Sequence, residues 1–369
     1  MRRYLLIAFF TAGILVTGEV RADSPYKATA LRAGENLSHA YGSSSSQQIG
    51  DWRGYDTGYN YHALLWNGPS GVNVDLHPSN FTQSFGEDVS GSQQVGYGSG
   101  PTTGDEYHAL LWSGSAASVV DLNPTGFAWS TANGISGSQQ VGGGIGQNTG
   151  NECHALLWKG TAESYIDLNP SGFTYSTAYK TNGSKQVGYG AGPTTGNNSH
   201  ALLWSGKASS YVDLSPTGFT ETVANDIEGS QQVGYGAGVA TSNQYHAMLW
   251  TGTATSYVDL NPSGLTLSMA LGTNGSVQVG YGYGPATYGK QHAMAWSGTA
   301  NSYIDLQQFV PAGLQCQESV AESVDANGNI IGWGFDSSNR GHALMWVIPE
   351  PSCISLFALG AIAILRRRK

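Results

Sequence analysis

The strongest constraint on the fold is a motif that returns at a fixed interval along the chain. The core of "YHALLWSG" (107–114) recurs as HALLW, HAMLW, HAMAW or HALMW, so that its histidine appears seven times. The first six histidines are 46 residues apart, and the last step is 50. A constant period of this length indicates an array of repeated structural units. The seven are His62, His108, His154, His200, His246, His292 and His342.

Each repeat contains four short segments rich in strand-forming residues. In the unit ending with the motif at His200 they are "SYIDL", "FTYSTAY", "KQVGYG" and "HALLW". The "NPSG" between the first two supplies the proline and glycine that a tight turn requires. Four strands in each unit predict an all-β fold, a seven-bladed β-propeller of four-stranded antiparallel blades. We count each blade from a "YxDL" segment to the next HA-x-x-W segment, and the way in which the ring closes stays open.

Both ends of the chain carry targeting patterns. Residues 1–22 combine Arg2 and Arg3, a long apolar run and "VRA" before the expected cleavage point, which predicts a secretory signal peptide. The repeat body then covers residues 23–348, and a sorting or anchor segment covers 349–369. Its apolar run, 353–365, predicts a short hydrophobic helix that is shorter than the roughly 20 residues of a full membrane span. We therefore expect transient or permanent membrane anchoring.

The C-terminal segment resembles a known sorting signal. Pro349, Glu350 and Pro351 precede the apolar run, and a basic cluster of Arg366, Arg367 and Arg368 follows it. This arrangement resembles the PEP-CTERM signal of Gram-negative bacteria that produce exopolysaccharide. The resemblance implies recognition by an exosortase and delivery to the cell surface or extracellular matrix. An ordinary anchor with cytoplasmic arginines is the alternative.

The repeat itself resembles a second family. The pattern "A-N-x-I-x-G-S-Q-Q-V-G-Y-G … H-A-L-L-W-x-G … D-L" is similar to the HAF family of extracellular repeats, although leucine or methionine stands where that family has phenylalanine. The resemblance implies an extracellular, propeller-like body. It supplies no reaction, no cofactor and no catalytic residues.

The charge and the cysteine content of the body limit which molecules and metals it is expected to bind. Residues 23–348 hold nine basic and 23 acidic residues, a net charge of −14. Nucleic acid and anionic membrane surfaces are therefore excluded as partners, because they bind basic faces. Cys153 and Cys316 are the only cysteines of this body, and their spacing does not fit a zinc site. Whether they pair is left open.

The repeated histidine has a companion in six of the seven units. An aspartate follows it 13 residues later, and a hydrogen bond between the two would stabilise adjacent strands. A ring of metal ligands is the rival interpretation, but imidazoles from separate blades would stand too far apart to share an ion. We therefore expect a structural role and no metal or cofactor. The aspartates are Asp75, Asp121, Asp167, Asp213, Asp259 and Asp305.

Two further groups are candidates for ligand contact. Tyrosines follow the glycine of the third segment and would either pack within the sheet or stack on sugar rings; they are Tyr97, Tyr189, Tyr235 and Tyr281. Several acids are not repeated and could include the carboxyl pair of a glycosidase. We expect most of these acids to be solvated charges in turns; they are Asp51, Asp56, Glu87, Asp88, Glu152, Asp226 and Glu228.

These observations favour an exported, non-catalytic structural or binding module. Near-identical blades would present equivalent shallow sites, whose weak contacts with polysaccharide or surface proteins gain from multivalency. The alternative is an extracellular polysaccharide hydrolase or lyase, and a rigid surface spacer is a third possibility. An enzyme should have one cleft lined by unrepeated acids, whereas a repeat binder should have equivalent pockets.

Overall fold

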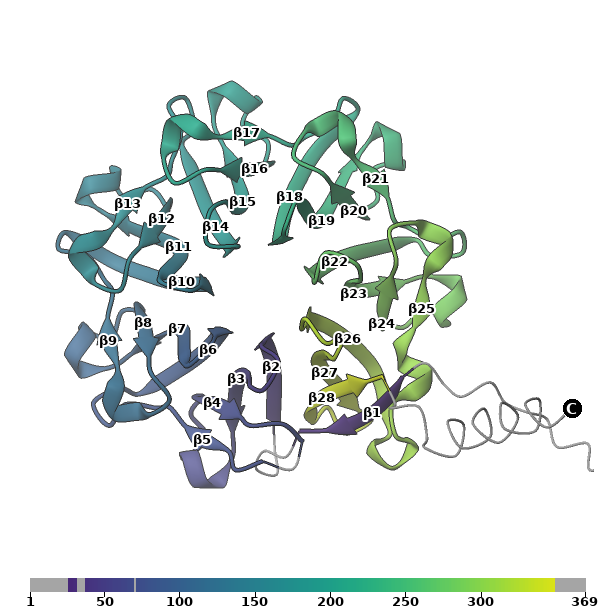
Figure 1. Cartoon of the computed structure of the whole chain (residues 1–369), viewed down its shortest axis with the longest axis horizontal. Coiled ribbons are helices and arrows are strands. Elements are labelled where there is room, and N and C mark those ends of the chain that lie inside the picture. The colour runs from purple at the N-terminus through teal and green to yellow at the C-terminus, as the bar shows by residue number, and fades with distance from the viewer. Residues whose placement is uncertain (1–25, 32–36, 70, 349–369) are drawn as a thin grey trace, which may run out of the picture. The chain divides into compact units, whose positions relative to one another are not determined.

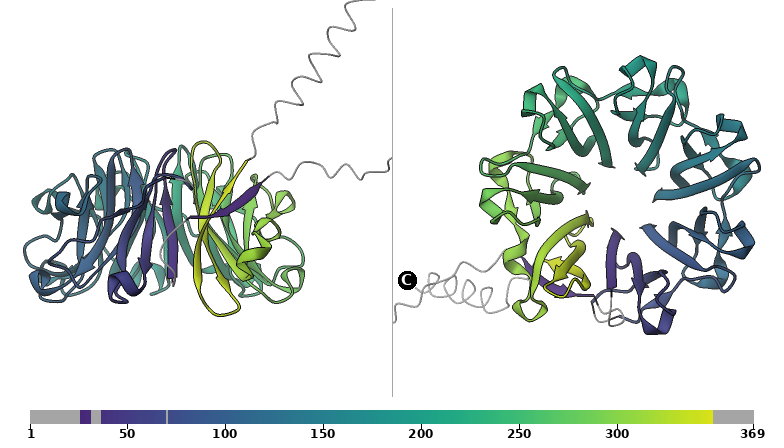
Figure 2. Two further views of the ribbon diagram at one scale, coloured as in Figure 1. Left: turned by 90° about the horizontal axis from the view of Figure 1, so that it is seen from below. Right: turned by 180° about the vertical axis from the view of Figure 1, so that it is seen from behind.

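The strands of the body form seven groups around a common axis (Figure 1). The computed structural model describes residues 26–31, 37–69 and 71–348. The expected signal peptide and sorting segment lie outside these residues. Within the described part of the chain, no helix is long and apolar enough to cross a membrane. The predicted seven-bladed, all-β propeller is confirmed, and the blades stand side by side as a thick disc (Figure 2).

Six blades take their four strands consecutively from the sequence. The first consists of β2 (Leu37–Ser43), β3 (Gln48–Arg53), β4 (His62–Trp66) and β5 (Val74–Asp75). The next two consist of β6 (Gln83–Ser90), β7 (Gln93–Ser99), β8 (His108–Trp112) and β9 (Val120–Asp121), then β10 (Phe127–Ser136), β11 (Gln139–Gly146), β12 (His154–Trp158) and β13 (Ile166–Asp167). The fourth and fifth consist of β14 (Tyr175–Thr181), β15 (Gln186–Ala191), β16 (His200–Trp204) and β17 (Val212–Asp213), then β18 (Phe219–Glu228), β19 (Gln231–Gly238), β20 (His246–Trp250) and β21 (Val258–Asp259). The sixth consists of β22 (Leu267–Thr273), β23 (Gln278–Tyr283), β24 (His292–Trp296) and β25 (Ile304–Asp305).

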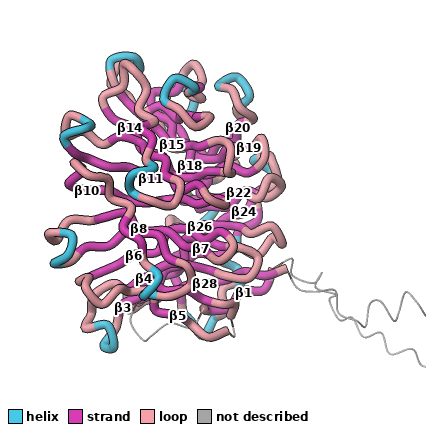
Figure 3. Tube along the Cα trace, turned by 60° about the vertical axis from the view of Figure 1, so that its left-hand side comes forward, coloured by secondary structure: helices cyan, strands magenta, loops and turns pink. Residues whose placement is uncertain are grey.

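The connections contain short 3-10 helices, which lie on the periphery of the strand bundle (Figure 3). Those between second and third strands are η1 (Tyr55–Thr57), η2 (Pro101–Thr103), η4 (Gln147–Thr149), η6 (Pro193–Thr195), η8 (Val239–Thr241) and η10 (Pro285–Thr287). Those between third and fourth strands are η3 (Ala116–Ser118), η5 (Ala162–Ser164), η7 (Ala208–Ser210), η9 (Ala254–Ser256) and η11 (Ala300–Ser302). The insertion in the last repeat forms η12 (Leu306–Phe309) and η13 (Ala312–Leu314).

The blade boundary lies one strand away from where we placed it. The aspartate strand does not begin a blade but closes the preceding one, because β9 pairs with β8 in an antiparallel hairpin that sets Leu110 opposite Asp121. The connection between these two strands, 113–119, contains the 3-10 turn η3, whereas "NPTG" follows β9 and leads to β10. The turn with proline and glycine therefore links blades instead of strands within a blade.

The same shift explains how the ring closes. The seventh blade contains β26 (Cys316–Val324), β27 (Ile330–Asp336) and β28 (Gly341–Val347), and its outermost strand is β1 (Lys27–Ala30) from the other end of the chain. Ala28 lies opposite Trp346 in this antiparallel pair. Strands from both ends of the sequence thus share one blade.

The repeated residues hold neighbouring blades together. Each motif tryptophan is buried between two blades, as Trp158 is with Val95, Leu111 and Phe127. A hydroxyl on the first strand of each following blade accepts a hydrogen bond from the N–H of the motif alanine, at 2.8–3.1 Å in all seven cases. Because these contacts repeat at every blade interface, they account for the conserved period within this chain.

One interface lacks a ring that its equivalents have. Phe127 packs edge-on against Tyr165 with 5.3 Å between ring centroids, and two further blades have the same pair. Val119 stands at the equivalent position beside Phe81, and both line a surface pocket of about 530 Å³. Replacing Val119 with tyrosine fills this space.

We expect Val119→Tyr to raise the free energy of unfolding by about 1 kcal/mol, the usual value of an added aromatic pair. Urea denaturation measures the change. Val120→Tyr is the control, because that neighbouring side chain is exposed and faces no ring. Equal stability of the two variants would mean that the pocket is not an aromatic site.

Candidate functional site

The repeated histidines and aspartates meet in pairs on the outer strands of the blades. In six blades the histidine Nδ1 lies 2.7–2.8 Å from the aspartate Oδ2. The other carboxylate oxygen accepts the backbone N–H two residues later, as Asp121 does from Asn123. His342 differs, because its Nε2 lies 3.3 Å from Asp336. The pairs do not converge, and among the described residues no group of three or more histidine, cysteine or acidic side chains could hold a metal ion.

The four candidate tyrosines lie on second strands, each in contact with a neighbour. Tyr97 stacks on Phe85 at 4.9 Å between ring centroids and lines a pocket near the axis. Tyr189 packs against Tyr179, Tyr235 packs against Tyr245, and the Tyr281 hydroxyl contacts the sulfur of Met269. Both Cys153 and Cys316 are free.

The pocket near the axis is where the repeat loses its symmetry. It has a volume of about 520 Å³ and takes one residue from the equivalent position of every innermost strand. Six of these seven positions follow the 46-residue period, and the last is displaced by the insertion. In a ring of perfect repeats these seven side chains would be identical, yet here they are of four types. They are Tyr41, Glu87, Asn133, Tyr179, Asn225, Leu271 and Glu322.

A β-bulge presents each of these seven side chains. The antiparallel register between the first and second strands skips one residue in every blade, for example between Gly86 and Asp88. The residue skipped at this bulge is the pocket residue in all seven blades, and three blades have a second register shift nearer the start of the first strand. Because a bulge redirects the side chain that it carries, the fold offers seven independent positions around one space.

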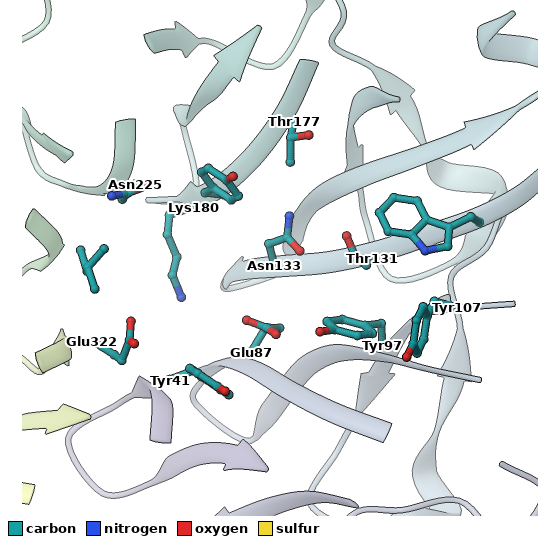
Figure 4. A pocket seen from close by; sticks show the side chains of 13 residues that line it. Tyr41, Glu87, Tyr97, Tyr107, Thr131, Asn133, Thr177, Lys180, Asn225 and Glu322 are labelled. Atoms are coloured by element: carbon teal, nitrogen blue, oxygen red, sulfur yellow. The ribbon is translucent and has the colours of Figure 1, made fainter. Parts of the chain in front are cut away.

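The residues that follow the bulges stabilise the ring from within. Asp88 accepts the N–H of Ile135 at 2.9 Å, and Asp226 accepts that of Thr273 at 2.8 Å, so each links its blade to the next. The Lys180 ammonium lies 3.0 Å from Asp88. Figure 4 shows Lys180 extending from its strand toward the same space as Glu87 and Glu322.

The two glutamates have unusual proton affinities. Burial raises the pKa of Glu87 to about 8, and Lys180 offsets only part of this effect. Burial also raises the pKa of Glu322 to about 7, against the opposing effect of the Trp333 indole, which donates a 2.7 Å hydrogen bond to Oε1. Both side chains are half-buried, so solvent reaches them. Carboxyl groups with pKa values near neutrality are suited to acid–base chemistry.

Our placement of the unrepeated acids in turns is wrong for most of them. Glu87 and Asp88 lie on β6, Asp226 and Glu228 on β18, and Asp51 on β3. Only two lie in connections, Asp56 in η1 and Glu152 in a turn. The bulge explains the error, because it allows an acid on a strand to reach the axis instead of the sheet interior.

Comparison with known proteins supports the fold. No family model and no curated protein matches the chain. The β-propeller domain of the trilobed protease from Pyrococcus furiosus is similar, with a TM-score of 0.54 at 9% identity over 86% of this chain and 100% of that domain. A Mycobacterium tuberculosis puromycin-hydrolyzing peptidase gives a TM-score of 0.55 at 9% identity over 84% of this chain and 51% of that one. A puromycin hydrolase gives 0.54 at 11% identity, with 85% and 52% covered. The chain therefore spans about half the length of these two hydrolases.

These neighbours correct the expectation that the protein is not an enzyme. That expectation relied on the repeated sequence, which spreads identical residues over seven places. The matching propellers belong to a protease and to puromycin hydrolases, so a propeller architecture is no argument against catalysis. At 9–11% identity the likeness itself extends to the fold alone.

Proposed function

We propose that this chain is an exported hydrolase of extracellular polysaccharide whose single active site is the pocket at the axis. The observation that carries the proposal is the pair Glu87 and Glu322, two carboxyls with raised pKa values at equivalent bulges of one pocket. A pocket lined by unrepeated acids, in place of equivalent pockets on every blade, is the feature that separates an enzyme from a repeat binder. Export and surface sorting follow from the terminal patterns and belong to the proposal.

The two carboxyls divide the roles of acid and base. Glu87 keeps its proton at neutral pH and donates it to the glycosidic oxygen as the bond to the anomeric carbon breaks. Glu322 has the lower pKa and, when ionised, takes a proton from the water whose oxygen bonds to that carbon. Proton exchange with solvent then restores both groups. A lyase remains the second outcome of the same acid–base pair.

The walls of the pocket suit a sugar. Tyr97, Tyr107, Tyr179 and Trp129 contribute aromatic faces, and Asn133 and Asn225 contribute amides at the bulges. The two amides already donate to backbone oxygens of the next blade, at 2.9 and 2.8 Å. Aromatic rings stack against the apolar faces of sugar units, so these rings are expected to hold the chain while the glutamates flank the bond.

The test uses residues 23–348, which contain every described strand. This body is incubated with extracellular polysaccharides of different charge, and new reducing ends are measured. Reducing ends without ultraviolet absorbance indicate hydrolysis, and unsaturated ends indicate a lyase. If no polysaccharide gains new ends, the enzymatic proposal is rejected.

The Trp333 indole provides a pH test of the base. Its hydrogen bond favours the ionised form of Glu322, so Trp333→Phe raises the pKa of that carboxyl further. Because the base must be ionised, the acidic limb of the kcat/KM profile is expected to move upward by about one pH unit. Trp129→Phe is the control, since this residue lines the same pocket but is not among the groups that shift the pKa of either glutamate, so it should change KM without moving the limb. An unmoved limb in Trp333→Phe would exclude Glu322 as the base.

A further inference from the structure

The charges around the pocket are unbalanced. Four carboxyls stand at the bulges or immediately after them, and Lys180 is the one cation among the residues that line the pocket. The Asp88 carboxylate forms an ion pair with that ammonium, with 3.0 Å between Lys180 Nζ and Asp88 Oδ2. The Asp51 carboxylate lies 3.0 Å from His39, and its negative charge also raises the pKa of Glu87. Lys180 extends toward the space of Glu87 and Glu322, but its ammonium is paired with Asp88, so the carboxyls around this space outnumber the cations.

The proton affinities agree with this imbalance. Burial raises the pKa of Glu87, and the charges of Asp51, Glu322 and Asp88 raise it further. Lys180 lowers this pKa but offsets only part of the increase. For Glu322, the Trp333 indole, His39 and Lys180 oppose burial without cancelling it. Two carboxyls that hold protons near neutral pH form a site in which a bound cation replaces a proton.

Aromatic side chains lie beside the two glutamates (Figure 4). Tyr41 stands at the bulge next to that of Glu87, and Tyr97 and Tyr107 meet edge to face at 5.2 Å between ring centroids. The faces of such rings attract ammonium groups and stack on sugars. Carboxyls and neighbouring tyrosines together line a space of about 520 Å³, which is the size of a pocket for a small ligand.

We propose that the pocket binds a sugar unit with a free ammonium group, so that the substrate is a polymer of non-acetylated amino sugar. This inference rests on the proposed function and names its substrate class. A uronic acid polymer would place a carboxylate beside Glu87 and Glu322, and an acetylated amino sugar would leave both without a counter-charge. The ammonium ionises one carboxyl and leaves the other protonated, which sets the acid and base for hydrolysis.

The experiment compares three probes by titration calorimetry at a pH of about 6.5, below the pKa values of both glutamates. The probes are glucosamine hexamer, N-acetylglucosamine hexamer and galacturonate hexamer. We expect the glucosamine hexamer to bind at least about tenfold more tightly than either other probe. Titration in two buffers of different ionisation heat should show release of about one proton for each bound hexamer. Equal or tighter binding of the acetylated or acidic hexamer overturns the proposal.

A variant separates the carboxyl from the aromatic contribution. Glu322→Gln is expected to weaken the glucosamine hexamer by about tenfold and to reduce the proton release, with no effect on the acetylated hexamer. Glu152→Gln is the matched control, because that acid is exposed in a turn outside the pocket. Unchanged affinity for glucosamine hexamer in Glu322→Gln contradicts the proposal even if the wild type prefers that probe.

The two proposals fail in different ways. Tight binding of glucosamine hexamer without cleavage of any polysaccharide supports the ammonium site and rejects the hydrolase. Cleavage of a neutral or acidic polysaccharide without preference for glucosamine keeps the hydrolase and rejects the ammonium site.

Discussion

Glu87→Gln is expected to lower the rate of polysaccharide cleavage by about 10²–10⁴-fold, the usual contribution of a general acid. Glutamine has nearly the same size and lacks the proton that the leaving oxygen requires. Glu87 makes no hydrogen bond that the ring depends on, whereas its neighbour Asp88 links two blades. The substitution should therefore remove chemistry and leave stability unchanged.

Kinetics with the polysaccharide that gives new reducing ends measures the effect. Glu152→Gln, which makes the same substitution at the surface, is expected to retain full activity. Substrates with an activated leaving group need no acid, so they should restore most of the rate to Glu87→Gln. An equal loss on both kinds of substrate would show that Glu87 does not act as the acid.

The fold could be predicted from the period of the sequence repeat. The 46-residue spacing and four strand segments in each unit were sufficient to predict the seven blades, because identical interfaces demand identical residues at identical intervals. The blade boundary could not be predicted in the same way. The segment of Asp121 has strand character wherever it pairs, and only the short turn through Ala116–Ser118 decides that it folds back on β8.

Only one of the two glutamates of the candidate site could be singled out from the sequence. Glu87 stands out among the unrepeated acids, but Glu322 follows the insertion at η12 and η13, which moves it away from the 46-residue period. Alignment of the bulge positions would have found it, since the equivalent of Glu87 in the last repeat is Glu322. The residue after the bulge does not mark it, because glycine, lysine, aspartate or serine stands there.

The closing strand governs the stability of the ring. Without β1, the edge of β28 would expose unpaired backbone groups and the buried side chains of Leu344 and Trp346. Ala28 is 4% exposed and lies opposite Trp346, whereas the adjacent Lys27 points outward. These two neighbours therefore form a matched pair for testing the closure.

Ala28→Asp is expected to lower the free energy of unfolding by about 3–5 kcal/mol, because the new carboxylate is buried without a partner. Lys27→Asp introduces the same side chain on the solvent side of the strand and should change stability by no more than about 0.5 kcal/mol. Urea denaturation gives both values, and limited proteolysis should cut Ala28→Asp first next to β1. The difference between the two variants measures how much the buried face of β1 contributes to stability, because both substitutions lie on β1 and differ only in the face that they alter. If the two variants are equally stable, β1 does not close the seventh blade, and the ring must be held by contacts between the first and last blades alone.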